Sequence, residues 1–121
     1  MPKEEFVHQL QEMGYKVESL GDNRVAFDWI VPSGRFAETR IRLGFEVPTD
    51  FPLNPPSGPH ISPRLMPINT QSGLHPNCGI HESPHFGADW QYWSRPIKHW
   101  TNTKRTVKDV LAHVRHLFDT L

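Results

Sequence analysis

The stretch RIRLGFEV, residues 40–47, has the clearest strand pattern of this chain. Along it, apolar side chains recur at every second position, and these positions are Ile41, Leu43, Phe45 and Val47. Successive side chains of a β-strand point to opposite faces, so the alternation predicts a strand with one buried and one solvated face. Antiparallel sheets commonly face water on one side, and we therefore expect an antiparallel sheet.

Two further strands are predicted upstream, over residues 15–20 and 24–31. The second of them has alternating apolar side chains, and Gly-, Asn- and Pro-containing turns at residues 21–23 and 32–34 bound it on both sides. Three consecutive strands with short connections form a meander.

Helices are predicted at both ends of the chain. Over residues 3–13 the apolar side chains have helical spacing, and Gly14 provides a stop. Near the end, the same spacing links Val107, Val110, Leu111, Val114, Leu117, Phe118 and Leu121. We expect an α+β fold, in which helices pack on one face of an antiparallel sheet of three to four strands, in a single domain over residues 1–121.

The middle of the chain is rich in proline: the 12 prolines are concentrated between Pro48 and Pro96. Proline lacks a backbone N–H, so we expect this region to be extended loop. Residues 60–65 are expected to form a short edge strand, because the prolines exclude a central one.

Composition narrows the function classes. The 121 residues carry 13 Lys+Arg and 13 Asp+Glu without a basic stripe, which argues against a nucleic-acid partner. We find no apolar run long enough to span a bilayer, and one cysteine cannot form an intrachain disulfide. We therefore expect a cytoplasmic protein with no membrane partner.

That single cysteine, Cys78, lies in the stretch GLHPNCGIH, residues 73–81. A structural cysteine usually lies in an apolar element, whereas this one is surrounded by turn-forming residues and histidines. Because a cationic imidazole favours the thiolate, His75 and His81 would make Cys78 more nucleophilic. A different chemistry stays open, since the pattern H-x2-C-x2-H-x3-H offers four zinc ligands, which are His75, Cys78, His81 and His85.

Taken in order, these features resemble the ubiquitin-conjugating enzyme (UBC) superfamily, and more closely its compact bacterial members. The resemblance rests on the leading helix, the meander, the aromatic-Pro-x-x-Pro-Pro segment 51–56, the tripeptide His75-Pro76-Asn77, Cys78, the tryptophan-rich stretch 90–95 and the closing helix. It implies the UBC fold over nearly the whole chain.

The resemblance also implies a function. Such an enzyme accepts a ubiquitin-like protein from an activating enzyme as a thioester on Cys78 and passes it to a nucleophile of a target protein, without a cofactor of its own. It implies an oxyanion-stabilising role for Asn77 and a docking role for the leading helix, where Lys3, Glu4 and Gln11 are expected to be exposed. From its own chemistry, His75 is expected to stabilise the thiolate or to accept a proton from the incoming amine. Some bacterial sets of such proteins act against phage. A catalytically silent adaptor that binds the modifier is the alternative within the same fold.

One departure from the family pattern concerns the spacing. Cys78 follows Asn77 directly, whereas in the eukaryotic family the cysteine lies several residues beyond this asparagine. A side chain next to the thiol is poorly placed to reach over its thioester. Backbone N–H groups after Cys78 are therefore the competing oxyanion donors.

Overall fold

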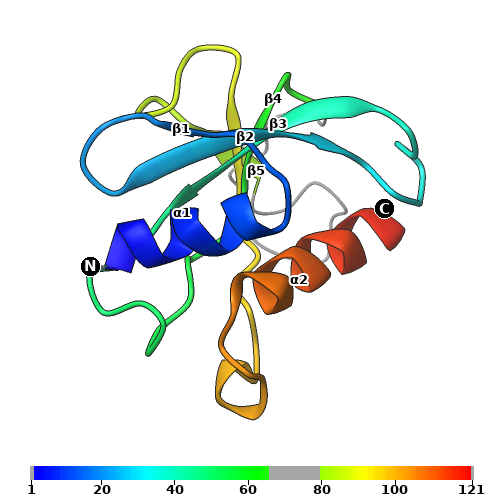
Figure 1. Ribbon diagram of the computed structural model, residues 1–121. Helices are drawn as coiled ribbons and strands as arrows, with labels where there is room; N and C mark the ends of the chain where they lie inside the picture. Colours follow the sequence, from blue (N-terminus) through cyan, green and yellow to red (C-terminus); the bar gives the residue numbers. More distant parts are fainter. Residues whose placement is uncertain (1, 66–79, 121) are drawn as a thin grey trace.

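The computed structural model describes residues 2–65 and 80–120 of the chain (Figure 1). In chain order the elements are α1 (Pro2–Glu12), β1 (Val17–Ser19), β2 (Arg24–Ile30), β3 (Arg40–Glu46), β4 (His60–Ser62), β5 (Ile80–Glu82), β6 (Gln91–Trp93), the 3-10 helix η1 (Trp100–Asn102) and α2 (Val107–Asp119). The predicted α+β class is therefore confirmed.

Within these ranges the strands form one antiparallel sheet in the order β1-β2-β3-β4-β6-β5. The pairing of β2 with β3 is the longest and places Trp29 opposite Ile41 and Val25 opposite Phe45. The apolar side chains of both strands therefore share one face. The predicted meander of three strands is present as β1, β2 and β3.

The short strand predicted within residues 60–65 is present, but its expected position at the sheet edge is wrong. The strand there, β4, is interior, because it pairs with β3 on one side and with β6 on the other. It spans only three residues, and Pro59 and Pro63 flank it, so no proline interrupts its hydrogen bonds. The strand count also differs: the described residues contain six strands rather than three or four, because β5 and β6 lie in the region expected to be loop.

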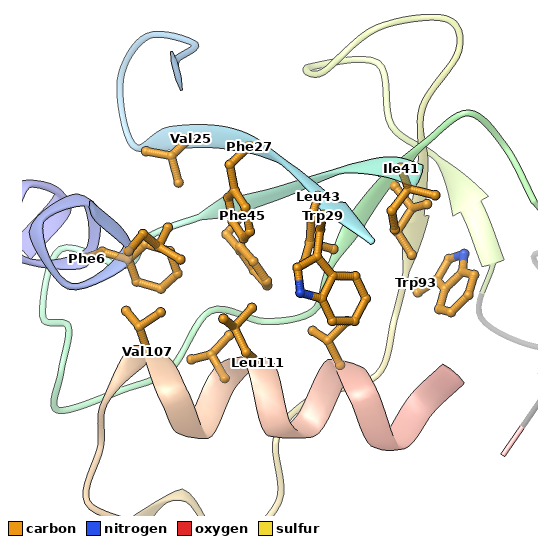
Figure 2. Close-up of a cluster of buried hydrophobic side chains, with 14 of the residues drawn as sticks. Phe6, Val25, Phe27, Trp29, Ile41, Leu43, Phe45, Trp93, Val107 and Leu111 are labelled. Carbon is orange, nitrogen blue, oxygen red and sulfur yellow. The ribbon is translucent and has the colours of Figure 1, made fainter. Parts of the chain in front are cut away.

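Both helices cover the apolar face of the sheet, as predicted (Figure 1). The stripe of α2 that faces the sheet is buried and consists of Val107, Val110, Leu111, Val114 and Phe118. Figure 2 shows Val107 and Leu111 of this stripe pointing toward the aromatic residues of β2 and β3, and the whole stripe belongs to the same buried cluster. Phe6 of α1 joins the same cluster, with its ring centroid 5.5 Å from that of Phe45.

The helix ends follow local chemistry. Gly14 lies two residues after the end of α1. Its φ of 95° is a conformation that glycine adopts without strain. At the start of α2, Thr106 and Asp109 form a reciprocal capping box. Neither helix in the described ranges is both long and apolar enough to cross a membrane.

Phe118 provides the test of this packing. Its fully buried ring contacts Trp29 of β2 and Trp93 of β6, with centroid separations of 5.7 and 5.0 Å. Phe118→Ala should lower the free energy of unfolding by about 3–5 kcal/mol, because it leaves a cavity between α2 and the sheet. His116→Ala, an exposed control on the same helix, should change it by less than about 0.5 kcal/mol in urea unfolding. Equal losses for both variants would contradict the packing.

Candidate active site

The three residues predicted to be catalytic, His75, Asn77 and Cys78, belong to residues 66–79, which lie outside the described residues. The described residues that border this segment are Leu65 and Ile80. Both are joined to β6: the backbone N–H of Leu65 donates to the side chain of Gln91, and Ile80 pairs with Trp93. One short strand thus holds the chain before and after the segment.

Gln91 is the buried polar residue of this arrangement, with no exposed surface. Its Oε1 accepts hydrogen bonds from the backbone N of Leu65 at 2.9 Å and from the indole Nε1 of Trp93 at 3.0 Å. A carbonyl oxygen has two lone pairs and can serve both donors. The residue before Leu65 is held as well, because Nε of Arg64 donates to the backbone carbonyl of Trp90 at 3.0 Å.

On the face of the sheet opposite the helices, an aromatic cluster forms around His60. The imidazole stacks on Phe86 with centroids 4.1 Å apart and an interplanar angle of 22°. Its other neighbour is Tyr92 of β6, at 4.7 Å, and Phe86 in turn contacts Trp90 at 5.1 Å. The end of the sheet that leads to residues 66–79 is therefore packed on both faces.

Gly44 makes room for this cluster. It lies opposite His60 in the pairing of β3 with β4, and a Cβ at this position would come within 2.5 Å of Phe86 and 3.0 Å of Trp90. Real Cβ atoms do not approach so closely, so the position requires glycine. In the sequence, Gly44 replaces a charged residue at the solvent-facing positions of the stretch 40–47, which are otherwise Arg40, Arg42 and Glu46. This glycine is the one sequence signal of the aromatic cluster on the face opposite the helices.

His60 also forms a buried hydrogen bond with Ser83. Its Nδ1 lies 2.6 Å from Oγ of Ser83, and the two residues are only 8% and 3% exposed. Burial lowers the pKa of His60 from 6.5 to about 4, with smaller contributions from His85 and Arg24. The imidazole is therefore neutral at neutral pH. Sequence reasoning missed both residues, because neither belongs to a motif or a periodic segment.

The histidines proposed as zinc ligands are only partly described. His81 is half-buried on the face of His60, with its ring 6.2 Å from that of Tyr92, and His85 is exposed. Within residues 2–65 and 80–120, no group of three or more His, Cys, Asp or Glu side chains is placed to hold a metal ion. His75 and Cys78 are outside these ranges, so the four-ligand zinc set remains a hypothesis.

Three tryptophans, Trp90, Trp93 and Trp100, are buried. Trp93 and Trp100 belong to the core under the helices. Trp90 lies instead in the cluster around His60, through its contact with Phe86.

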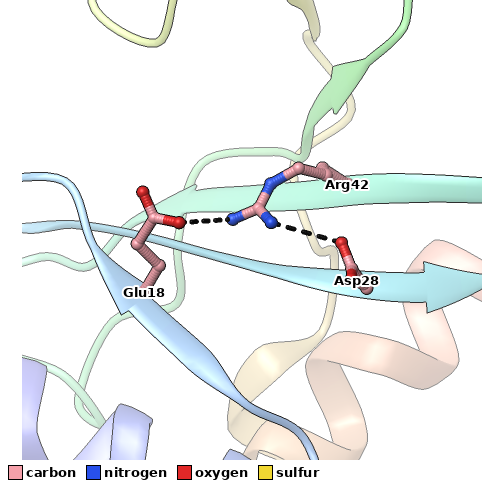
Figure 3. A network of polar contacts seen from close by, with 3 residues as sticks. All are labelled: Glu18, Asp28 and Arg42. Carbon is pink, nitrogen blue, oxygen red and sulfur yellow. Dashed lines mark hydrogen bonds and ion pairs between the residues drawn. The ribbon is translucent and has the colours of Figure 1, made fainter.

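The remaining outer face, over β1 to β3, is charged. Arg42 lies 3.2 Å from both Glu18 and Asp28, so that it bridges β1 and β2 (Figure 3). These ion pairs are exposed and contribute little to stability. On α1, Glu4 and Gln11 are exposed as predicted, whereas Lys3 is half-buried and donates to Oγ of Ser19.

Comparison with known proteins gives one family. The model of prokaryotic E2 family E matches residues 2–120. No curated protein and no solved structure shows significant similarity to the chain.

The buried neutral state of His60 predicts a pH-dependent stability. Because its pKa is lower in the folded protein than in the unfolded chain, the unfolded chain binds the additional proton between pH 6.5 and 4. The contribution of His60 is complete above pH 6.5 and should fall by about 3 kcal/mol as the pH drops to about 4. The measurement is urea unfolding of the parent and of His60→Gln from pH 7 to 4. Their difference in unfolding free energy should shrink toward acid, and a constant difference would contradict a buried neutral His60.

Proposed function

Because the chain belongs to prokaryotic E2 family E, we propose that it is a conjugating enzyme that carries a ubiquitin-like protein as a thioester on Cys78. The family match over residues 2–120 is the observation that carries this proposal, since it implies a conjugating role with a modifier and an activating enzyme as partners. Thioester chemistry needs a thiol, and Cys78 is the one cysteine in the sequence.

The described residues support a site at this end of the sheet. Cys78 precedes Ile80, the first residue of β5, by two positions in the sequence. On both sides of residues 66–79 the chain is fixed to β6, through Gln91 and through the pairing of Ile80 with Trp93. A nucleophile must be held close to its productive geometry, and rigid strands hold it better than an isolated loop.

The proposed reaction consists of two acyl transfers. First, the thiolate of Cys78 attacks the carbonyl carbon of the thioester between modifier and activating enzyme. A new C–S bond forms, and the thiolate of the activating enzyme leaves. Then an amine of the target attacks the carbonyl carbon on Cys78. A C–N bond forms, the C–S bond breaks, the thiolate of Cys78 leaves, and the amine gives a proton to a base.

Each transfer passes through a tetrahedral oxyanion that needs hydrogen-bond donors. We assign this role to backbone N–H groups after Cys78, because Asn77 is its immediate neighbour. His75 is proposed to favour the thiolate when charged or to accept the proton of the incoming amine. The activating enzyme would consume the ATP, so the conjugating enzyme needs no cofactor, and a cytoplasmic location fits this supply.

The first test of the proposal concerns Cys78. With activating enzyme, modifier and ATP, the parent protein should form an adduct that a thiol reductant removes. Cys78→Ser should give a more stable oxyester or no adduct, because an alkoxide is a poorer leaving group than a thiolate. The measurement is non-reducing gel electrophoresis with and without reductant.

Two outcomes would contradict the assignment. Conjugation by Cys78→Ala at the parent rate would exclude the cysteine mechanism. Tight binding of the modifier without an adduct on the parent would favour a silent adaptor.

The second test distinguishes the groups that assist Cys78. Asn77→Ala should leave single-turnover discharge to an amine within about threefold of the parent, because the backbone donors remain. His75→Ala should slow discharge more at neutral pH, because the thiolate loses a cationic neighbour. Loading is measured separately. A 10²–10³-fold slower discharge for Asn77→Ala, roughly the effect of removing one oxyanion donor, would instead assign that role to Asn77.

A further inference from the structure

The structure ties β5 to β4 by side chains as well as through the sheet. β6 lies between these two strands, so they share no backbone pairing. His60 belongs to β4, and Ser83 directly follows β5. Their hydrogen bond of 2.6 Å therefore connects strands on opposite sides of β6, past the ring of Tyr92.

Ser83 also anchors the turn that follows β5, through its backbone. The backbone carbonyl of Ser83 accepts hydrogen bonds from the N–H groups of Phe86 and Gly87, both at 3.0 Å. This turn brings Phe86 back over the imidazole, where the two rings stack. Backbone, hydroxyl and ring contacts at Ser83 thus converge on His60.

Burying a hydroxyl and an imidazole removes both from water and costs free energy unless they are hydrogen-bonded. A hydroxyl and an imidazole without partners would each lose their hydrogen bonds to water, so each depends on the other. Because the imidazole is neutral, it binds the hydroxyl without the penalty of a buried charge. An apolar pair could fill the same volume, but it would not fix the direction in which Ser83 is held.

We propose that His60 and Ser83 are positioning residues for the thioester chemistry, because their hydrogen bond holds the carboxyl end of β5, the short strand whose first residue follows Cys78 by two positions. This inference rests on the proposed function. Neither residue touches the reacting atoms in this proposal; both act through β5.

The first part of the test needs no partner protein. In Ser83→Ala, amide hydrogen exchange measured by NMR should become at least about tenfold faster at Ile80–Glu82, because the end of the strand is no longer held. Val25→Ala, a buried control on β2 far along the sheet order, should change global stability without this local effect. Unchanged exchange at β5 would overturn the proposal.

The second part measures chemistry with a defined probe, a Gly-Gly peptide thioester that acylates Cys78 without an activating enzyme. Discharge of the peptide to free lysine is followed in single turnover over a range of lysine concentrations. Ser83→Ala should lower the maximal rate by about 10–100-fold, the effect of a small misplacement, with the half-saturating lysine concentration unchanged. Ser83→Thr, which retains the hydroxyl, should restore the rate.

His60→Phe serves as the second variant, because it keeps a ring between Phe86 and Tyr92 and removes only the hydrogen bond. It should match Ser83→Ala, and the double variant should be no slower than either single one. Parent rates in both single variants would overturn the positioning role. A parent protein whose Cys78 is acylated by the probe but discharges no faster than a free thiol thioester would overturn the proposed function, and the role of the pair with it.

Discussion

The fold depends on how β6, a strand of only three residues, is held in the sheet. It pairs with β4 on one side and with β5 on the other, and its Gln91 accepts a hydrogen bond from the backbone of Leu65. Leu65 and Ile80, the residues on either side of 66–79, are therefore both held by β6. A buried amide is costly unless it is hydrogen-bonded, and the backbone N–H of Leu65 and the indole of Trp93 both donate to Gln91. This constraint gives the segment with Cys78 two fixed ends.

The two faces of the sheet differ in what they pack against. The face under α1 and α2 holds the main core, in which the apolar stripe of α2 packs on the aromatic residues of β2 and β3 (Figure 2). The opposite face is charged over β1 to β3 but packed around His60 near β6. Stability comes mainly from the first face. The second adds directional contacts beside the proposed site, at the price of a glycine at position 44.

Sequence alone predicted the elements whose periodicity extends over several residues. Both helices and the meander were found because residues 40–47 and the terminal helix have apolar patterns longer than one repeat. β5 and β6 have no sequence signal, because three residues are too few to show an alternating pattern. β4 is interior although prolines are dense around it, because Pro59 and Pro63 flank the strand and do not interrupt it. The pair of His60 and Ser83 depends on tertiary contacts across 23 positions, which no local pattern reveals. The catalytic assignments of His75, Asn77 and Cys78 lie outside the described residues and remain predictions.

Whether Cys78 carries the modifier as a thioester can be measured by intact-mass spectrometry of the protein after reaction with activating enzyme, modifier and ATP. We expect a mass increase equal to one modifier less one water, located on the peptide that contains Cys78 and removed by excess thiol at neutral pH. A mass increase that survives the thiol treatment and maps to another residue would contradict a thioester on Cys78, as would an unchanged mass when the activating enzyme itself is loaded.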